Sequence, residues 1–77
     1  MSDMRNPEER LTRLLARLRS SDETIRIHAA LRLTGPGIDA AQARLALSEA
    51  LHDADEPVRK LAAWAMARLA GPTRAAA

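Results

Sequence analysis

The amino-acid sequence predicts an all-α chain in which four helices pair into two stacked helical hairpins, forming a short α–α superhelix. Three observations support this fold class. Ala, Leu and Arg dominate the 77 residues, Phe and Tyr are absent, and Trp64 is the only aromatic residue, which is a composition of helix formers. Every proline falls where a helix would begin or end, and the second half of the chain repeats the pattern of the first. The four prolines are Pro7, Pro36, Pro57 and Pro72.

The first hairpin is predicted over about residues 7–34. Asn6 can cap a helix, Pro7 suits its first position, and Glu9 can return a hydrogen bond to the cap, so we expect a helix to Arg19. Its leucines recur at the spacing that places them on one buried stripe. A second helix is expected over about residues 23–34, between a Ser-Ser-Asp-Glu cap and a Gly-Pro-Gly turn. The leucines of the stripe are Leu11, Leu14, Leu15 and Leu18.

The second hairpin is predicted over about residues 39–70. Asp39 can cap a third helix, which is expected to end near His52. A fourth helix is expected to open at the acidic turn before Pro57 and to stop at Gly71. We expect residues 1–77 to form a single domain, with a tail at residues 71–77. The predicted inward faces are Ala43, Leu47, Ala50 and Leu51 on the third helix, and Val58, Ala62, Ala65, Met66 and Leu69 on the fourth.

The internal repeat becomes visible when the chain is aligned with itself so that Leu18 falls on Leu51. A helix pair repeated at this period indicates an α-solenoid, in which each pair buries its open face on the next. Two repeats are fewer than the three or so that a solenoid generally needs, so we expect both ends to be covered by a second copy or by a larger assembly. The other matching pairs are Asp22 and Asp55, Glu23 and Glu56, Ile25 and Val58, Arg26 and Arg59, Ala29 and Ala62, and Ala30 and Ala63.

Residues 55–69 carry an acidic turn, then Val-Arg, then Ala-Ala, and close on an Ala-Arg-Leu segment. This pattern resembles the second helix of a HEAT-like repeat, of the short kind found in phycobilisome-lyase-type proteins. Residues 22–34 resemble it too, except that Arg32 stands where the second copy has Ala65. The resemblance implies a hydrogen-bonded ladder between repeats, built from the acidic turn residue and the arginine. It assigns this architectural role to Asp22, Arg26, Asp55 and Arg59. A functional anion site on the same arginines is the alternative interpretation.

The second helix of each repeat also offers a candidate partner-binding face. The alignment of the two copies places Ile27 opposite Lys60 and Leu31 opposite Trp64. In HEAT-like proteins this helix layer forms the concave, partner-binding surface. The sequence therefore predicts a protein-interaction module, a scaffold or accessory subunit that binds a protein partner or a second copy through this face and the open repeat ends. The other interpretation is that Trp64 folds over the end of the last repeat.

Three arginines suggest a different class of function. Arg10, Arg13 and Arg17 lie on one side of the first predicted helix and form a possible anion-binding strip, which is the basis for an alternative nucleic-acid-binding role. The competing interpretation is a solvated outer face, partly neutralised by Glu8 and Glu9. The formal net charge of only +2 gives nucleic-acid binding little support.

Catalysis, cofactor binding and metal binding are not expected. The chain has no cysteine, its only histidines are His28 and His52 on different predicted helices, and it carries neither a Gly-rich phosphate loop nor a nucleophile with a suitable base. No apolar run approaches the roughly 20 residues of a membrane span, and no signal peptide opens the chain. We therefore expect a cytoplasmic protein that is not an enzyme and has no membrane segment.

Overall fold

The computed structural model describes residues 6–71, in which four helices account for all the regular secondary structure. The predicted all-α fold class is confirmed. The tail predicted at residues 71–77 lies, apart from Gly71, outside the described residues. The helices are α1 (Pro7–Arg17), α2 (Glu23–Arg32), α3 (Ala40–Ala50) and α4 (Glu56–Ala70).

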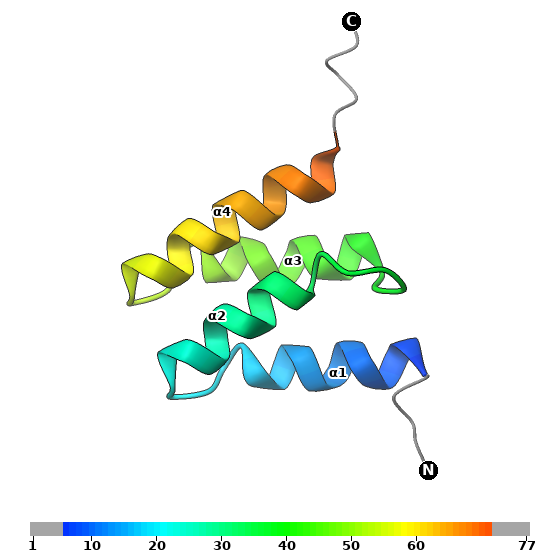
Figure 1. Cartoon of the computed structure of the whole chain (residues 1–77), viewed down its shortest axis with the longest axis horizontal. Coiled ribbons are helices and arrows are strands. Elements are labelled where there is room, and N and C mark those ends of the chain that lie inside the picture. The colour runs from blue at the N-terminus through cyan, green and yellow to red at the C-terminus, as the bar shows by residue number, and fades with distance from the viewer. Residues whose placement is uncertain (1–5, 72–77) are drawn as a thin grey trace, which may run out of the picture.

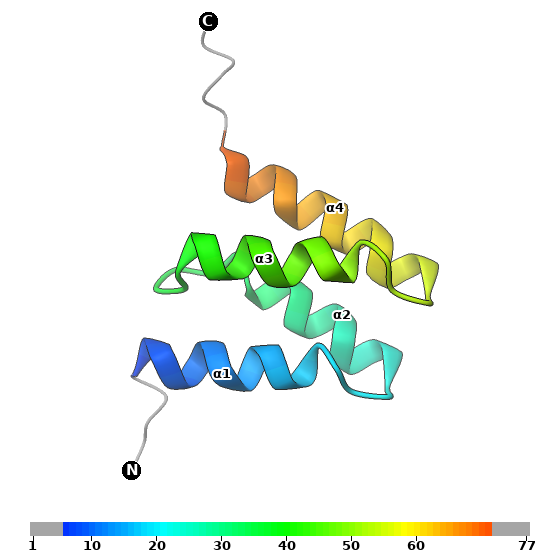
Figure 2. The same cartoon turned by 180° about the vertical axis from the view of Figure 1, so that it is seen from behind.

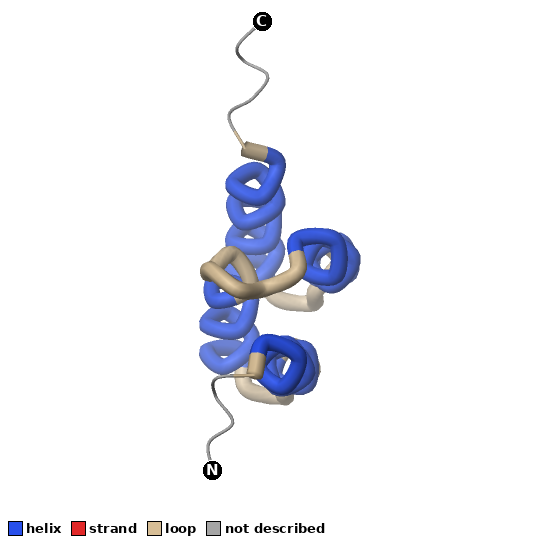
Figure 3. Tube along the Cα trace, turned by 90° about the vertical axis from the view of Figure 1, so that its right-hand side faces the viewer, coloured by secondary structure: helices blue, strands red, loops and turns tan. Residues whose placement is uncertain are grey.

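The helices form two layers, as expected for stacked hairpins. In two opposite views α1 and α3 lie side by side and run in the same direction (Figures 1 and 2). The view along these helices shows α1 and α3 in one layer and α2 and α4 in the other (Figure 3). Within each hairpin α1 packs on α2 and α3 packs on α4, while the contact between α2 and α4 joins the two hairpins. Helix α1 starts at one end of the stack and α4 ends at the other (Figure 1).

Side-chain caps fix where three of the helices begin. The carboxamide or carboxylate oxygens of Asn6, Asp22 and Asp39 accept hydrogen bonds from the backbone N–H two residues further on, at 2.9, 2.8 and 2.9 Å. Asp55 occupies the same position before α4 but makes no such bond, because its carboxylate is used elsewhere.

The first three helices end earlier than the sequence suggested. The backbone N–H groups of Arg19, Thr34 and His52 bond to carbonyls three residues earlier rather than four, so the last turn tightens and α-helical geometry stops about two residues sooner. The ends predicted at about Arg19, Thr34 and His52 therefore each lie two residues beyond the observed ones. The turn after α2 passes through Gly37, whose φ of 83° favours glycine.

One core runs through both hairpins and is built largely from alanine. Small side chains let the helices approach closely, but each alanine removes little apolar surface from water, so the larger buried residues carry much of the stabilisation. Leu33, Leu47 and Val58 are the largest fully buried side chains. Leu51, Met66 and Leu69, predicted to face inward, are partly buried against this core. Its members are Leu14, Ala29, Ala30, Leu33, Ala43, Leu47, Ala50, Val58, Ala62 and Ala65.

Two leucines of α3 provide a matched test of this core. Leu47 is fully buried, whereas Leu45 is 66% exposed. Leu47→Ala is expected to lower the free energy of unfolding by about 2–5 kcal/mol, because it leaves a cavity among helices that cannot collapse fully. Leu45→Ala is expected to cost less than about 0.5 kcal/mol. Urea unfolding followed by circular dichroism measures both, and equal losses would contradict the described core.

Candidate functional site

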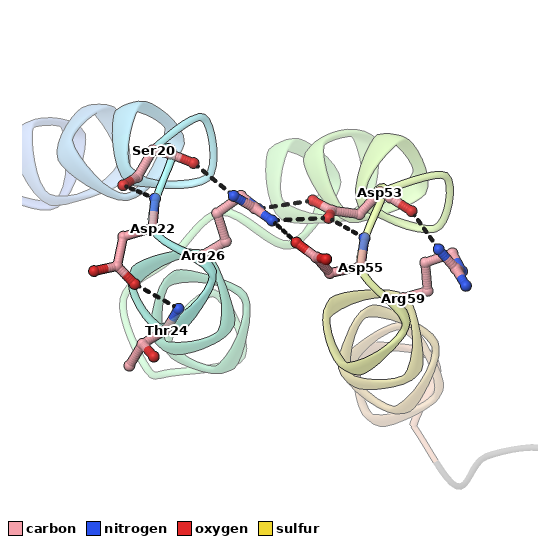
Figure 4. Close-up of polar contacts among 7 residues, drawn as sticks. All are labelled: Ser20, Asp22, Thr24, Arg26, Asp53, Asp55 and Arg59. Carbon is pink, nitrogen blue, oxygen red and sulfur yellow. Dashed lines mark hydrogen bonds and ion pairs between the residues drawn. The ribbon is translucent and has the colours of Figure 1, made fainter.

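The turn inside each hairpin has the same hydrogen-bond pattern in both repeats (Figure 4). In the first repeat the Ser20 hydroxyl accepts from the backbone N–H two residues on, at 2.9 Å, and its carbonyl accepts from Arg26 Nη1 at 2.8 Å. In the second repeat Asp53 Oδ1 accepts from the backbone N–H of Asp55 at 2.9 Å, and the Asp53 carbonyl accepts from Arg59 Nη1 at 2.6 Å. Each second helix is thus fixed to its own turn by an arginine in its first turn.

Arg26 also reaches across to the second repeat, which Figure 4 shows. Its Nε donates to Asp53 Oδ2 at 3.0 Å, and its Nη2 donates to Asp53 Oδ1 at 3.2 Å and to Asp55 Oδ2. The side chains of Arg26 and Asp53 are only 12% and 13% exposed. This group of three side chains, the Arg26 joint, therefore connects a turn and helix of the first repeat to the turn of the second.

The two carboxylates of the Arg26 joint stabilise the charged form of Arg26. Burial disfavours the charged guanidinium, but hydrogen bonds and attraction from Asp53 and Asp55 outweigh that effect and raise the pKa of Arg26 above its usual value. The arginine therefore stays charged throughout the physiological pH range. Asp55 gives up its capping bond to α4 in order to face this guanidinium.

The four residues that the resemblance assigned to the ladder do not all meet. Arg26 and Asp55 come together, whereas Asp22 accepts from the Thr24 N–H as a helix cap and Arg59 donates to the carbonyl of its own turn. Within residues 6–71, Asp22 and Arg59 form no ion pair. The sequence reasoning missed Asp53, although an acidic residue where the first repeat has Ser20 was a visible difference between the copies.

The predicted partner-binding residues lie on the layer of α2 and α4, but they differ in exposure. Leu31 and Trp64 are 43% and 44% exposed. Lys60 is exposed, and its Nζ lies 3.6 Å from Glu56 Oε2. Ile27 is partly buried against the core. The guanidinium carbon of Arg68 lies 5.0 Å from the centroid of the Trp64 ring, a cation–π arrangement.

The predicted arginine strip lines a hollow of about 300 Å³ rather than a flat helix face. A fourth arginine, Arg32 at the end of α2, joins it, and the sequence reasoning had noted that residue only as a departure from the repeat pattern. The hollow is lined by Arg10, Arg13, Leu14, Arg17, Arg32, Gly35, Pro36 and Ile38.

A second hollow, of about 380 Å³, lies between α1 and α3, the two helices of one layer. Leu15, Leu18 and Leu45 line it together with charged residues of both signs, including Arg19 and Glu49. Sequence reasoning did not single out this groove. The available signal was Leu45, which falls outside the predicted inward face of its helix and is the most exposed of the large apolar side chains in residues 6–71.

Comparison with protein families agrees with this architecture. A family model described as HEAT repeats matches residues 11–77. The chain belongs to the HEAT repeat family. The predicted family resemblance is thereby confirmed, and HEAT repeats are commonly non-enzymatic scaffolds for protein interaction. Comparisons with curated proteins and with solved structures gave no significant match.

The described part of this HEAT-repeat chain offers neither a metal site nor a membrane-spanning helix. No three or more His, Asp or Glu side chains in residues 6–71 are grouped so that they could hold a metal ion. Over the same residues no helix has both the length and the apolar character required to cross a membrane.

Arg26 and Arg59 allow the joint between HEAT repeats to be tested with an internal control. Both bind the carbonyl of their own turn, but only Arg26 contacts carboxylates of the other repeat. Because a lysine ammonium cannot reproduce the guanidinium fork, Arg26→Lys is expected to lower the urea midpoint clearly more than Arg59→Lys does. Equal midpoints for the two variants would contradict the role of the Arg26 joint.

Proposed function

We propose that this HEAT-repeat chain is a protein-interaction module, a small scaffold or accessory subunit that binds a different protein on the layer formed by α2 and α4. The observation that carries the proposal is the pair of large apolar side chains, Leu31 and Trp64, at equivalent positions of the two packed helices, 43% and 44% exposed. Tryptophan is enriched among the residues that dominate binding energy, because it buries a large area at low cost in conformational entropy.

The charges beside this pair favour a different protein over a second copy. Lys60 and Arg68 lie one helical turn on either side of Trp64, so a symmetric contact across Trp64 would bring like charges together. A partner surface with an apolar centre and acidic residues around it is complementary. Lys60 has an acidic neighbour within the chain, Glu56, whereas Arg68 lies over the Trp64 ring.

Nucleic-acid binding has weaker support. Stacking of bases on aromatic rings is a principal source of affinity for single strands, and the only aromatic residue, Trp64, lies on α4 and not beside the α1 arginines. Those arginines line a hollow together with Leu14, Pro36 and Ile38, and a partly apolar lining is a poor track for a phosphate backbone.

A photo-crosslinking amino acid tests the proposed surface in the cells that make the protein. Placed at position 31 or 64 it is expected to form an adduct with the same partner protein, identified by mass spectrometry. Placed at position 44, where Arg44 is exposed on α3, it is expected to form none. Leu31→Asp should abolish the adduct from position 64 while the helical circular dichroism is retained, because it sets a charge in the apolar centre of the contact.

Three outcomes would overturn the proposal. Adducts absent from positions 31 and 64, or equally abundant at position 44, would remove the layer of α2 and α4 as a binding surface. Adducts joining two copies of the chain would replace the different protein by a homo-oligomer. With the purified partner, Leu31→Asp is expected to raise the dissociation constant at least about tenfold, equivalent to about 1.4 kcal/mol, and an unchanged constant would contradict the proposal.

A further inference from the structure

The four arginines around the hollow occupy positions where the second repeat has alanine. The alignment that matches Leu18 with Leu51 pairs Arg10 with Ala43, Arg13 with Ala46, Arg17 with Ala50, and Arg32 with Ala65. Three of these alanines are buried, and the fourth packs against the core. In the second repeat Ala46 and Ala50 line the second hollow, which is shared with α1, and α4 packs on α2. No repeat within residues 6–71 lies on the corresponding side of the first repeat.

The hollow carries charge of one sign. Its charged lining consists of four arginines and no acidic residue, and none of the four forms an ion pair within residues 6–71. Surfaces that only need to be soluble mix both signs, whereas a guanidinium cluster matches carboxylates or phosphates. The remaining lining is apolar or glycine, with Leu14, Pro36 and Ile38 beside the guanidinium groups.

Arg10, which lines the hollow, has an unmet hydrogen-bond donor. Its guanidinium lies against the turn after α2, where a Cβ on Gly37 would come within 2.7 Å of Arg10 Nη2. Its Nε–H is buried and has no hydrogen-bond partner in the described part of the chain. A buried donor without an acceptor costs free energy, and a turn of the Arg10 side chain toward an oxyanion in the hollow would remove that cost.

We propose that the arginine hollow binds an acidic segment of a partner protein, in which carboxylates engage the guanidinium groups and an aliphatic side chain rests on Leu14 and Ile38. This inference rests on the proposed protein-interaction role and adds a second contact to it. The volume of about 300 Å³ suits one such side chain with its flanking carboxylates. A phosphate backbone would make no use of these apolar side chains.

A second copy of the chain is a poor occupant. Its acidic turn at residues 53–56 has the right composition, but Asp53 and Asp55 are already engaged by Arg26 and Glu56 by Lys60. Binding that turn would require the Arg26 joint to open. The acidic turn of a second copy is therefore a poor ligand, and we assign the carboxylates to another protein.

Fluorescence anisotropy of a labelled peptide with alternating Asp and Leu residues tests the inference directly. The intact protein is expected to bind it, and Arg32→Glu to weaken binding at least about tenfold, or about 1.4 kcal/mol. Arg44→Glu is the matched control, because it makes the same charge change at an exposed position of α3 outside the hollow. It is expected to change the affinity less than about threefold, an effect of net charge alone.

Further arms separate the other interpretations. A peptide with Ser in place of Leu should bind more weakly, and a single-stranded oligothymidine should bind more weakly still. Arg13→Gln, which adds no negative charge, should also weaken the Asp-Leu peptide and serves if Arg32→Glu unfolds. Trp64→Ala, which changes no charge and affects a residue of the α2–α4 surface outside the hollow, should change peptide binding less than about twofold, so that a failure of that surface is distinguishable from a failure of the hollow.

The inference is overturned by any of three results. They are that the peptide fails to bind the intact protein, that Arg32→Glu and Arg44→Glu weaken peptide binding equally, or that the oligothymidine binds more tightly than the peptide. The last result would assign the hollow to nucleic acid instead.

Discussion

The stacking of the two hairpins depends on one guanidinium that satisfies acceptors on both of them. Arg26 bonds to the carbonyl of Ser20 in its own repeat and to the carboxylates of Asp53 and Asp55 in the next. Removing such a group from water is favourable only when all its partners are in place, so the Arg26 joint fixes the register of the repeats more than it adds net stability. Alanine side chains specify the register of two helices only weakly, so we expect the joint to contribute to it.

That constraint explains why equivalent positions of the two repeats have diverged. The repeat that accepts Arg26 has Asp53, whereas the first repeat has Ser20 at the same position and offers one carboxylate fewer. Ile27 contacts the core, whereas its counterpart Lys60 is exposed. Polar replacements on outer faces are the usual way in which a solenoid ends its stacking. The arginines around the hollow follow the same pattern, which disfavours the stacking of another identical repeat on that end.

Helix periodicity and proline positions predicted the fold from the sequence, because each helix carries its own start signal and buried stripe. The family resemblance predicted that Arg26 and Asp55 pair, but it did not predict the contact between Arg26 and Asp53, because that contact depends on how the repeats stack. The strip of Arg10, Arg13 and Arg17 was visible on one helix. Its enclosure by Arg32 and the turn at residues 35–38 was not, because periodicity describes one helix at a time.

Helix α2 links the two proposed contacts. Leu31 and Arg32 are adjacent, so their side chains leave the helix about 100° apart. Leu31 lies on the exposed surface of the layer formed by α2 and α4, whereas Arg32 lines the hollow. Arg26, in the first turn of the same helix, holds it to both turns. A partner that reaches both surfaces must pass around the end of α2, and the second contact then forms at high effective concentration, which multiplies two weak affinities. A short solenoid can in this way gain selectivity for a partner that is both apolar and acidic, without the area that further repeats would supply.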